Sequence, residues 1–144
     1  MKTVFFLLTC ISLLGNTHLH DGYLAAAETS ITASLGQAFD LKVGQEANIS
    51  PEQLTLQFLS VSEDSRCPQG ENCIWEGNGK VHLEFTPTGQ TSHVLELNTA
   101  MSLPSEATYV GYKISLLDLR PYPSAGSTIQ QSEYVATVRV STEA

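Results

Sequence analysis

The chain has few of the sequence features that usually indicate a function. It contains only 7 Lys and Arg residues against 15 Asp and Glu residues, which gives a formal net charge of −8. Such a surface repels phosphate backbones and anionic lipid head groups, so nucleic acids and membrane surfaces are not expected partners. The longest apolar run, residues 4–14, is about 11 residues long. A membrane-spanning helix needs roughly 20, so no membrane insertion is predicted.

Motifs for catalysis are also missing. There is no Gly-x-Ser-x-Gly nucleophile elbow, and no hydroxyl group is marked as activated. Gly77-x-Gly79 is no phosphate loop, because no helical pattern follows it. A redox Cys-x-x-Cys motif is absent too. We therefore predict that the protein is not an enzyme and holds no cofactor.

The first 27 residues have the pattern of a signal peptide. Lys2 precedes the apolar run, and Ala25-Ala26-Ala27 fits a signal-peptidase cut before Glu28. Cys10 lies inside the apolar run, after Thr9, which disfavours a lipoprotein anchor. The pattern predicts a secreted or periplasmic protein, most simply a soluble monomer.

The remaining chain alternates apolar and polar residues with a period of two, which is typical of half-buried strands. After a polar lead-in at 28–35, one domain is expected over 36–142. Its strands are predicted near 39–43, 45–49, 54–61, 81–85, 93–97, 112–119 and 134–140. A turn is expected at Asn78-Gly79 and a loop over 99–108.

Twice the alternation slips by one residue, near Phe58 and at Leu117. Such a slip indicates a β-bulge or a strand that passes between two sheets. Seven to eight short strands with regular turn signals predict an all-β fold, an antiparallel, Ig-like β-sandwich.

The most informative stretch is 64–79, which contains the only tryptophan and two of the three cysteines. In an oxidising compartment, with Cys10 removed, we expect a Cys67–Cys73 disulfide. A loop this short stabilises the fold by only about 2 kcal/mol, so the bond shapes the loop more than it holds the domain. Trp75 has two interpretations: beside a disulfide it is typical of a core, whereas an exposed tryptophan marks a binding site.

Loops on a rigid scaffold commonly carry function, so this acidic loop is our candidate binding surface. The hypothesis assigns binding to Asp64, Arg66, Glu71, Trp75 and Glu76, together with Arg120 and Tyr122 from a second loop. The expected partner is an extracellular or periplasmic protein or glycan.

Two other chemistries remain open for the carboxylates Glu63, Asp64, Glu71 and Glu76. Calcium binds such oxygens, but their spacing matches no calcium loop, and Arg66 is available as a counter-ion. A carboxylate-based hydrolase would need two of these groups at a set separation across a cleft.

His82 and His93 would approach each other if their strands form a hairpin. Two ligands make no convincing zinc site, so we predict no metal.

The run from Asp64-Ser65-Arg66-Cys67-Pro68 to Cys73-Ile74-Trp75-Glu76-Gly77 resembles the signature of a family of small exported bacterial proteins. Tyr112-x-Ile114-x-Leu116 and Pro121-Tyr122-Pro123 also match that family. The resemblance covers most of residues 54–123. It implies an exported, disulfide-bearing protein and carries no activity.

A shorter likeness is to the chagasin-type inhibitors of cysteine proteases. Arg120-Pro121-Tyr122 resembles their late Arg-Pro-aromatic loop, and Thr86-Pro87-Thr88-Gly89 faintly resembles their first loop. Their glycine-rich middle loop has no counterpart here. Protease inhibition is the alternative function that this likeness implies.

Overall fold

A computed structural model describes residues 30–144. The predicted signal peptide and Cys10 lie outside the described residues. Within 30–144, no helix has the length and apolar character required to span a bilayer.

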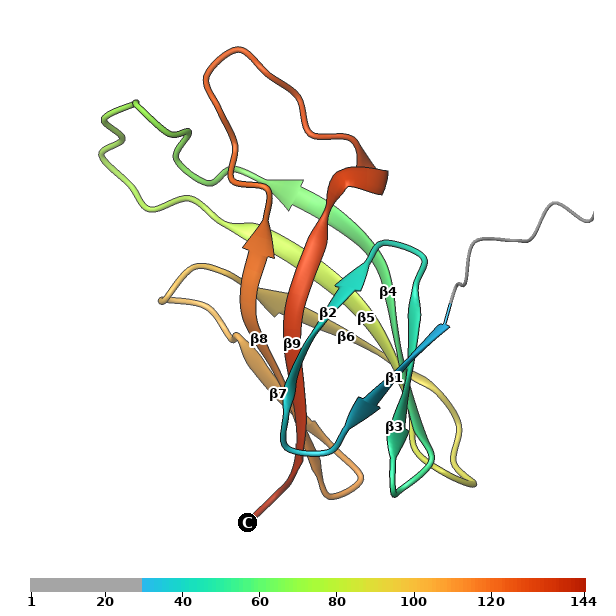
Figure 1. The fold of residues 1–144 in the computed structure, drawn as a ribbon. Coiled ribbons are helices and arrows are strands. Elements are labelled where there is room, and N and C mark those ends of the chain that lie inside the picture. Colours follow the sequence, from blue (N-terminus) through green and yellow to red (C-terminus); the bar gives the residue numbers. More distant parts are fainter. Residues whose placement is uncertain (1–29) are drawn as a thin grey trace, which may run out of the picture.

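The described chain forms a β-sandwich, as the alternation predicted, with nine strands in place of the expected seven to eight. A five-stranded sheet has the order β1-β3-β4-β5-β6, and a four-stranded sheet has the order β2-β9-β8-β7 (Figure 1). The strands are β1 (Ser30–Ser34), β2 (Ala38–Lys42), β3 (Glu46–Ser50), β4 (Leu54–Asp64), β5 (Gly79–Thr86), β6 (His93–Asn98), β7 (Glu106–Tyr109), β8 (Tyr112–Arg120) and β9 (Val135–Thr142), with a short 3₁₀ turn, η1 (Gln131–Glu133), before the last.

Consecutive hairpins build most of both sheets. β3 to β6 pair in sequence order, as do β7 to β9, all of them antiparallel. Only β1 pairs in parallel, with β3. This order differs from that of immunoglobulin constant domains, in which the second strand pairs with the fifth.

The inward positions of the strands form one hydrophobic core between the sheets. Because side chains alternate across a strand, every second residue is buried throughout β5, in β4 as far as Phe58 and in β9 as far as Val140. The largest fully buried side chains are Phe58, Phe85, Leu41, Ile49, Leu54, Leu56, Leu83, Leu97, Ile114 and Leu119.

Both predicted slips in the alternation are confirmed as irregularities of register. The β4–β5 pairing shifts between Phe58 and Ser60, and the β8–β9 pairing shifts between Leu116 and Asp118. An extra residue at such a bulge moves the following side chains to the other face of the strand. After the second shift, Leu117 is exposed and Leu119 is buried.

Three local predictions were wrong. The polar lead-in contains β1, so the sandwich begins at Ser30, and the expected loop at 99–108 includes most of β7. The expected turn at Asn78-Gly79 is absent, because Gly79 opens β5. A Cβ on Gly79 would lie 2.8 Å from Leu119 Cδ2, so glycine serves the close approach of the two sheets there.

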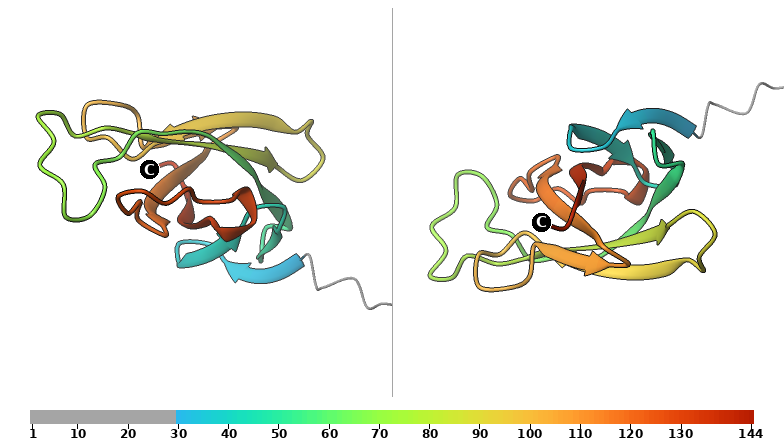
Figure 2. Two further views of the ribbon diagram at one scale, coloured as in Figure 1. Left: turned by 90° about the horizontal axis from the view of Figure 1, so that it is seen from above. Right: turned by 90° about the horizontal axis from the view of Figure 1, so that it is seen from below.

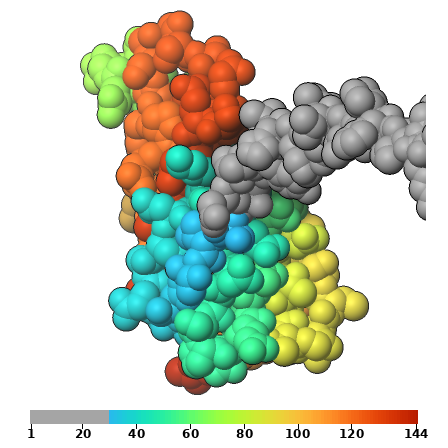
Figure 3. Space-filling view, turned by 45° about the vertical axis from the view of Figure 1, so that its right-hand side comes forward, coloured from blue at the N-terminus to red at the C-terminus, as the bar shows by residue number. Residues whose placement is uncertain are grey.

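Three loops gather at one end of the sandwich. They are the cysteine loop (65–78) between β4 and β5, the 99–105 loop between β6 and β7, and the 121–130 loop after β8 (Figure 1). Figure 2 shows the cysteine loop, in light green, projecting beyond the sheets in both views. In the space-filling view, the cysteine loop and the 121–130 loop form the upper end of the molecule (Figure 3).

Candidate functional site

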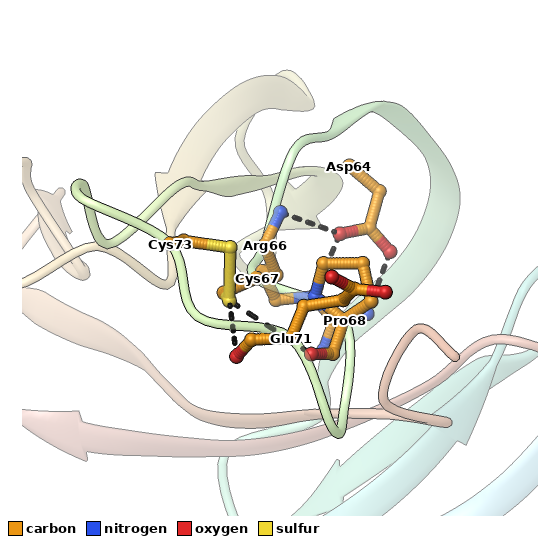
Figure 4. The surroundings of a disulfide bond; sticks show 6 residues. All are labelled: Asp64, Arg66, Cys67, Pro68, Glu71 and Cys73. Carbon is orange, nitrogen blue, oxygen red and sulfur yellow. Dashed lines mark hydrogen bonds and ion pairs between the residues drawn. A yellow bond between two sulfur atoms is a disulfide. The ribbon is translucent and has the colours of Figure 1, made fainter. Parts of the chain in front are cut away.

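The cysteine loop is closed by the predicted disulfide. Cys67 and Cys73 are bonded, with Cα atoms 5.9 Å apart, within the usual range for a disulfide (Figure 4). The base of the loop is held by the Ser65 amide, which donates to the Asn78 carbonyl at 2.7 Å. Gly77 has φ +72°, and a Cβ there would lie 1.9 Å from the Ser65 carbonyl oxygen, so only glycine fits this approach.

Arg66 links the two sheets from inside the loop. Its guanidinium donates to both carboxylate oxygens of Asp64, at 2.8 and 2.6 Å (Figure 4). It also donates to the carbonyls of Leu119 and Pro121, at the end of β8 in the other sheet. The side chains of Arg66 and Asp64 are only 3% and 10% exposed. The pair therefore anchors the loop to the scaffold.

A third group, Tyr134, completes this network. Its hydroxyl donates to Asp64 Oδ2 at 2.9 Å. Burial works to raise the pKa of Asp64, but the hydrogen bonds from Arg66 and Tyr134 outweigh it and hold that pKa below its usual value. Burial, reinforced by the Asp64 carboxylate, raises the pKa of Tyr134 to about 12. At neutral pH the network therefore contains an ionised Asp64 and a neutral Tyr134.

Besides the hydrogen bond from Arg66 to the Pro121 carbonyl, two further contacts fasten the 121–130 loop to the cysteine loop. The Arg66 guanidinium lies 4.8 Å from the centre of the Tyr122 ring, in cation–π geometry. The Gln69 amide donates to the Pro123 carbonyl at 2.9 Å, beside an isolated parallel bridge between Gln69 and Ser124.

The 99–105 loop is fastened by two buried asparagines. Asn78 Nδ2 donates to Asn98 Oδ1 at 2.8 Å, and Asn78 Oδ1 accepts from the amides of Thr99 and Ala100. Asn98 in turn donates to the Pro104 carbonyl at 3.1 Å. The Thr99 amide and the Pro104 carbonyl are also hydrogen-bonded to the backbone of Gly79 and Asn98, so the loop has a defined shape.

A cleft of about 320 Å³ opens where these loops meet β8. The cysteine loop contributes Glu76 and Gly77 to its lining, the next loop contributes Met101 and its neighbours, and β8 contributes residues 116–119. Arg66 and Tyr122 complete the lining. The size is at the lower end of the range for small-ligand sites, enough for one or two side chains.

Exposed apolar side chains stand around this end of the molecule. Met101 is 94% exposed, Ile74 91% and Trp75 68%. Glu76 Oε1 accepts from the Met101 amide at 3.0 Å, so the segment containing Ile74 and Trp75 adjoins the 99–105 loop. The interpretation of Trp75 as a core residue was wrong, because the loop carries it away from the sheets.

The structure places the predicted site residues in four settings. Asp64 and Arg66 are paired with each other and nearly buried, although Arg66 also lines the cleft, and their contact with a partner stays a prediction. Arg120 Nη2 donates to Asp40 at 2.6 Å, on the outer face of the four-stranded sheet. Glu71 and Trp75 are exposed on the cysteine loop, and Glu76 and Tyr122 line the cleft.

Most of the cleft lining was missed by the sequence analysis, including Met101, Leu117 and Asp118. Leu117 had a usable signal, because it stands at the slip in the alternation. Met101 lies in a segment without strand alternation, so the sequence does not indicate whether its side chain is buried or exposed. Asp118 had no signal, since nothing local indicates that it faces the cysteine loop.

The carboxylates that suggested calcium are scattered. Asp64 is paired with Arg66, Glu63 lies 3.9 Å from Lys80, and Glu76 accepts from a backbone amide. Among residues 30–144, no group of three or more His, Cys, Asp or Glu residues is placed to hold a metal ion.

His82 and His93 do share a hairpin, β5 with β6, but they do not meet. His82 pairs in register with Glu96 and hydrogen-bonds Ser62, whereas His93 pairs with Phe85 and stacks on Tyr109.

Comparisons with known proteins do not assign a function, so the functional argument depends on this geometry. No known family model, no curated protein and no solved structure matches the chain.

Proposed function

We propose that this protein is an exported binding module that docks a partner protein at the end of the sandwich where the three loops meet. One observation carries the proposal: exposed Trp75, Ile74 and Met101 stand beside a cleft whose walls are held rigidly by buried polar contacts. Large apolar side chains on a fixed frame are the usual anchors of protein–protein contacts, because little entropy is lost on binding.

Export is part of the proposal. It is supported by the leader pattern of residues 1–27 and by the resemblance of the Cys67–Cys73 signature to small exported bacterial proteins. A disulfide also persists best outside the cytoplasm. The mass of the protein recovered from its host, denatured, tests this part: it should equal residues 28–144 less two hydrogens.

Photo-crosslinking tests the docking surface. A photoreactive residue replaces Ser102, which is exposed between Met101 and Leu103, or replaces Gln90 in the β5–β6 turn at the opposite end of the sandwich. Each variant is irradiated with the exported proteins of the host. We expect one discrete crosslinked species from position 102 and none from position 90. Equal labelling from both positions, or none from either, would contradict the proposal.

A pair of matched variants shows whether the apolar rim carries the affinity. In the position-102 protein, Trp75→Ala with Met101→Ala should reduce the crosslinked species about tenfold or more, since an anchor truncation costs 2 kcal/mol or more. Val94→Ala with Val110→Ala removes two side chains that are each half-exposed and lie outside the cleft lining, and it should leave the yield unchanged. Both variants are checked for folding by circular dichroism.

A second candidate is a hydrolase that uses carboxylates. Its support is that Glu76 and Asp118 line the same cleft, as a pair acting on a glycosidic bond must. A screen of chromogenic glycosides with the wild type and with Glu76→Gln tests it: only turnover that the substitution abolishes would support the hydrolase. The likeness to chagasin-type inhibitors is tested by an assay against papain-like proteases.

A further inference from the structure

The charges of the cleft are unbalanced. Its charged lining residues are Arg66, Glu76 and Asp118. The Arg66 charge is already neutralised by Asp64 through a two-point contact. Asp118 has only a 3.4 Å approach to Nε of Arg120, whose Nη2 binds Asp40 at 2.6 Å. The cleft therefore presents carboxylates with little compensating positive charge.

The loops around the cleft cannot correct this imbalance. Apart from Arg66, there is no Lys, Arg or His in the three loops, residues 65–78, 99–105 and 121–130. Glu71 adds a further exposed negative charge to the cysteine loop. Arg66 and Arg120, the two cations that approach the cleft, are each paired with an aspartate, so a partner that brings positive charge would meet little unbalanced like charge at this end.

The apolar part of the lining suits a long basic side chain. Met101 and Leu117 are exposed there, and Tyr122 is half-exposed although Arg66 already lies over its ring. Arg and Lys side chains bury an aliphatic stem on apolar surface while the charged head reaches an acceptor. Glu76 Oε1 accepts from the Met101 amide, and no bond within the described residues uses Oε2.

We propose that the cleft receives an arginine or lysine side chain from an extended segment of the partner protein, flanked by apolar residues that contact the rim. The inference rests on the proposed function and adds the chemistry of the partner. The stem of the basic side chain packs on Met101 and Leu117, and its head binds Glu76 and Asp118.

Fluorescence anisotropy with labelled octapeptides tests the pairing. The probes are an alternating Arg-Leu peptide and matched peptides with Gln or Glu in place of Arg. We expect only the Arg-Leu peptide to bind the wild type, with an affinity that falls as salt rises. Glu76→Gln with Asp118→Asn should weaken it about tenfold. These amides keep the acceptor oxygens for the amides of Met101 and Leu119, so the loops retain their anchors.

A control variant separates the cleft from the overall charge. Glu46→Gln with Glu84→Gln also removes two negative charges, from β3 and β5, where both residues are in register with Gln57 and lie outside the cleft. We expect it to bind the Arg-Leu peptide as the wild type does. An equal loss in this control would overturn the inference, because it would show attraction to the whole acidic surface.

The other results also decide between the two proposals. If the Gln-Leu peptide binds as tightly as the Arg-Leu peptide, or if none of the peptides binds, the basic side chain is refuted. A crosslink that forms at position 102 and depends on Trp75 would then still support the binding module. If that crosslink is also absent, the proposed function fails as well.

Discussion

Replacing Arg66 by methionine removes the charge that links the two sheets and keeps a side chain of similar length. The guanidinium is 3% exposed, and its loss leaves Asp64, 10% exposed, with no counter-charge. The carbonyls of Leu119 and Pro121 lose a donor at the same time. Removing one partner of a buried ion pair costs about 3–5 kcal/mol. We expect Arg66→Met to lose this much of a total stability on the order of 5–15 kcal/mol.

The chain offers a matched control in Arg120, which pairs with Asp40. Both Arg–Asp pairs have an N–O distance of 2.6 Å, but the Arg120 and Asp40 side chains are 50% and 54% exposed. Exposed pairs contribute about 0.2–1 kcal/mol, because water solvates the separated charges almost as well. Arg120→Met should therefore lose much less stability than Arg66→Met.

Urea unfolding followed by circular dichroism measures both variants, with the slope of the transition checked for two-state behaviour. The double variant Arg66→Met with Asp64→Leu is the decisive addition. It leaves no buried charge, so it should be more stable than Arg66→Met alone. The reasoning is refuted if Arg66→Met and Arg120→Met cost the same, or if the double variant is the least stable.

Two further predictions concern the same end of the molecule. Gly77→Ala and Gly89→Ala both place a side chain at positive φ, +72° and +71°, but only Gly77 faces an obstacle, the Ser65 carbonyl. Thermal unfolding should show a loss of about 1–2 kcal/mol for Gly89→Ala and roughly 2 kcal/mol more for Gly77→Ala; similar values would contradict the close approach. Burial and Asp64 raise the pKa of Tyr134 from 10.0 to about 12, so its contribution is complete below pH 10 and is lost as the pH rises toward 12. Between pH 10 and 12 the free energy of unfolding should fall less in the Tyr134→Phe variant than in the wild type. If the two proteins show parallel plots of unfolding free energy against pH, the network is contradicted.

Much of the fold was predictable because its signals are local. A period of two needs only five or six neighbouring residues, and the slips near Phe58 and Leu117 are visible within one strand each. β1 was missed because Ser30–Ser34 is short and mostly polar, and because its parallel pairing with β3 has no sequence signature. Asn78 was taken for a turn residue, since nothing nearby indicates that Asn98 hydrogen-bonds its side chain.

The candidate site was only partly predictable. The cysteine loop and the disulfide were expected, whereas Asp64 and Arg66 were assigned to the binding of a partner. The exposure of Trp75 was not, because a tryptophan beside a disulfide is compatible with either a core or a surface position. The cleft was missed because its walls come from three loops and from β8.

The sequence by itself determined the elements whose causes lie within a few residues: the strands with clear alternation, both bulges and the short disulfide loop. Only the tertiary structure decided what the charged residues do. Asp64 meets Tyr134 70 residues away, and Arg66 meets the Leu119 carbonyl 53 residues away. Burial turns this pair into a link between the sheets, whereas Glu76, ten residues beyond Arg66, lines the cleft and accepts only a backbone amide there. Distance along the chain carries no information about burial, and burial determines whether a charge supports the scaffold or is available to a partner.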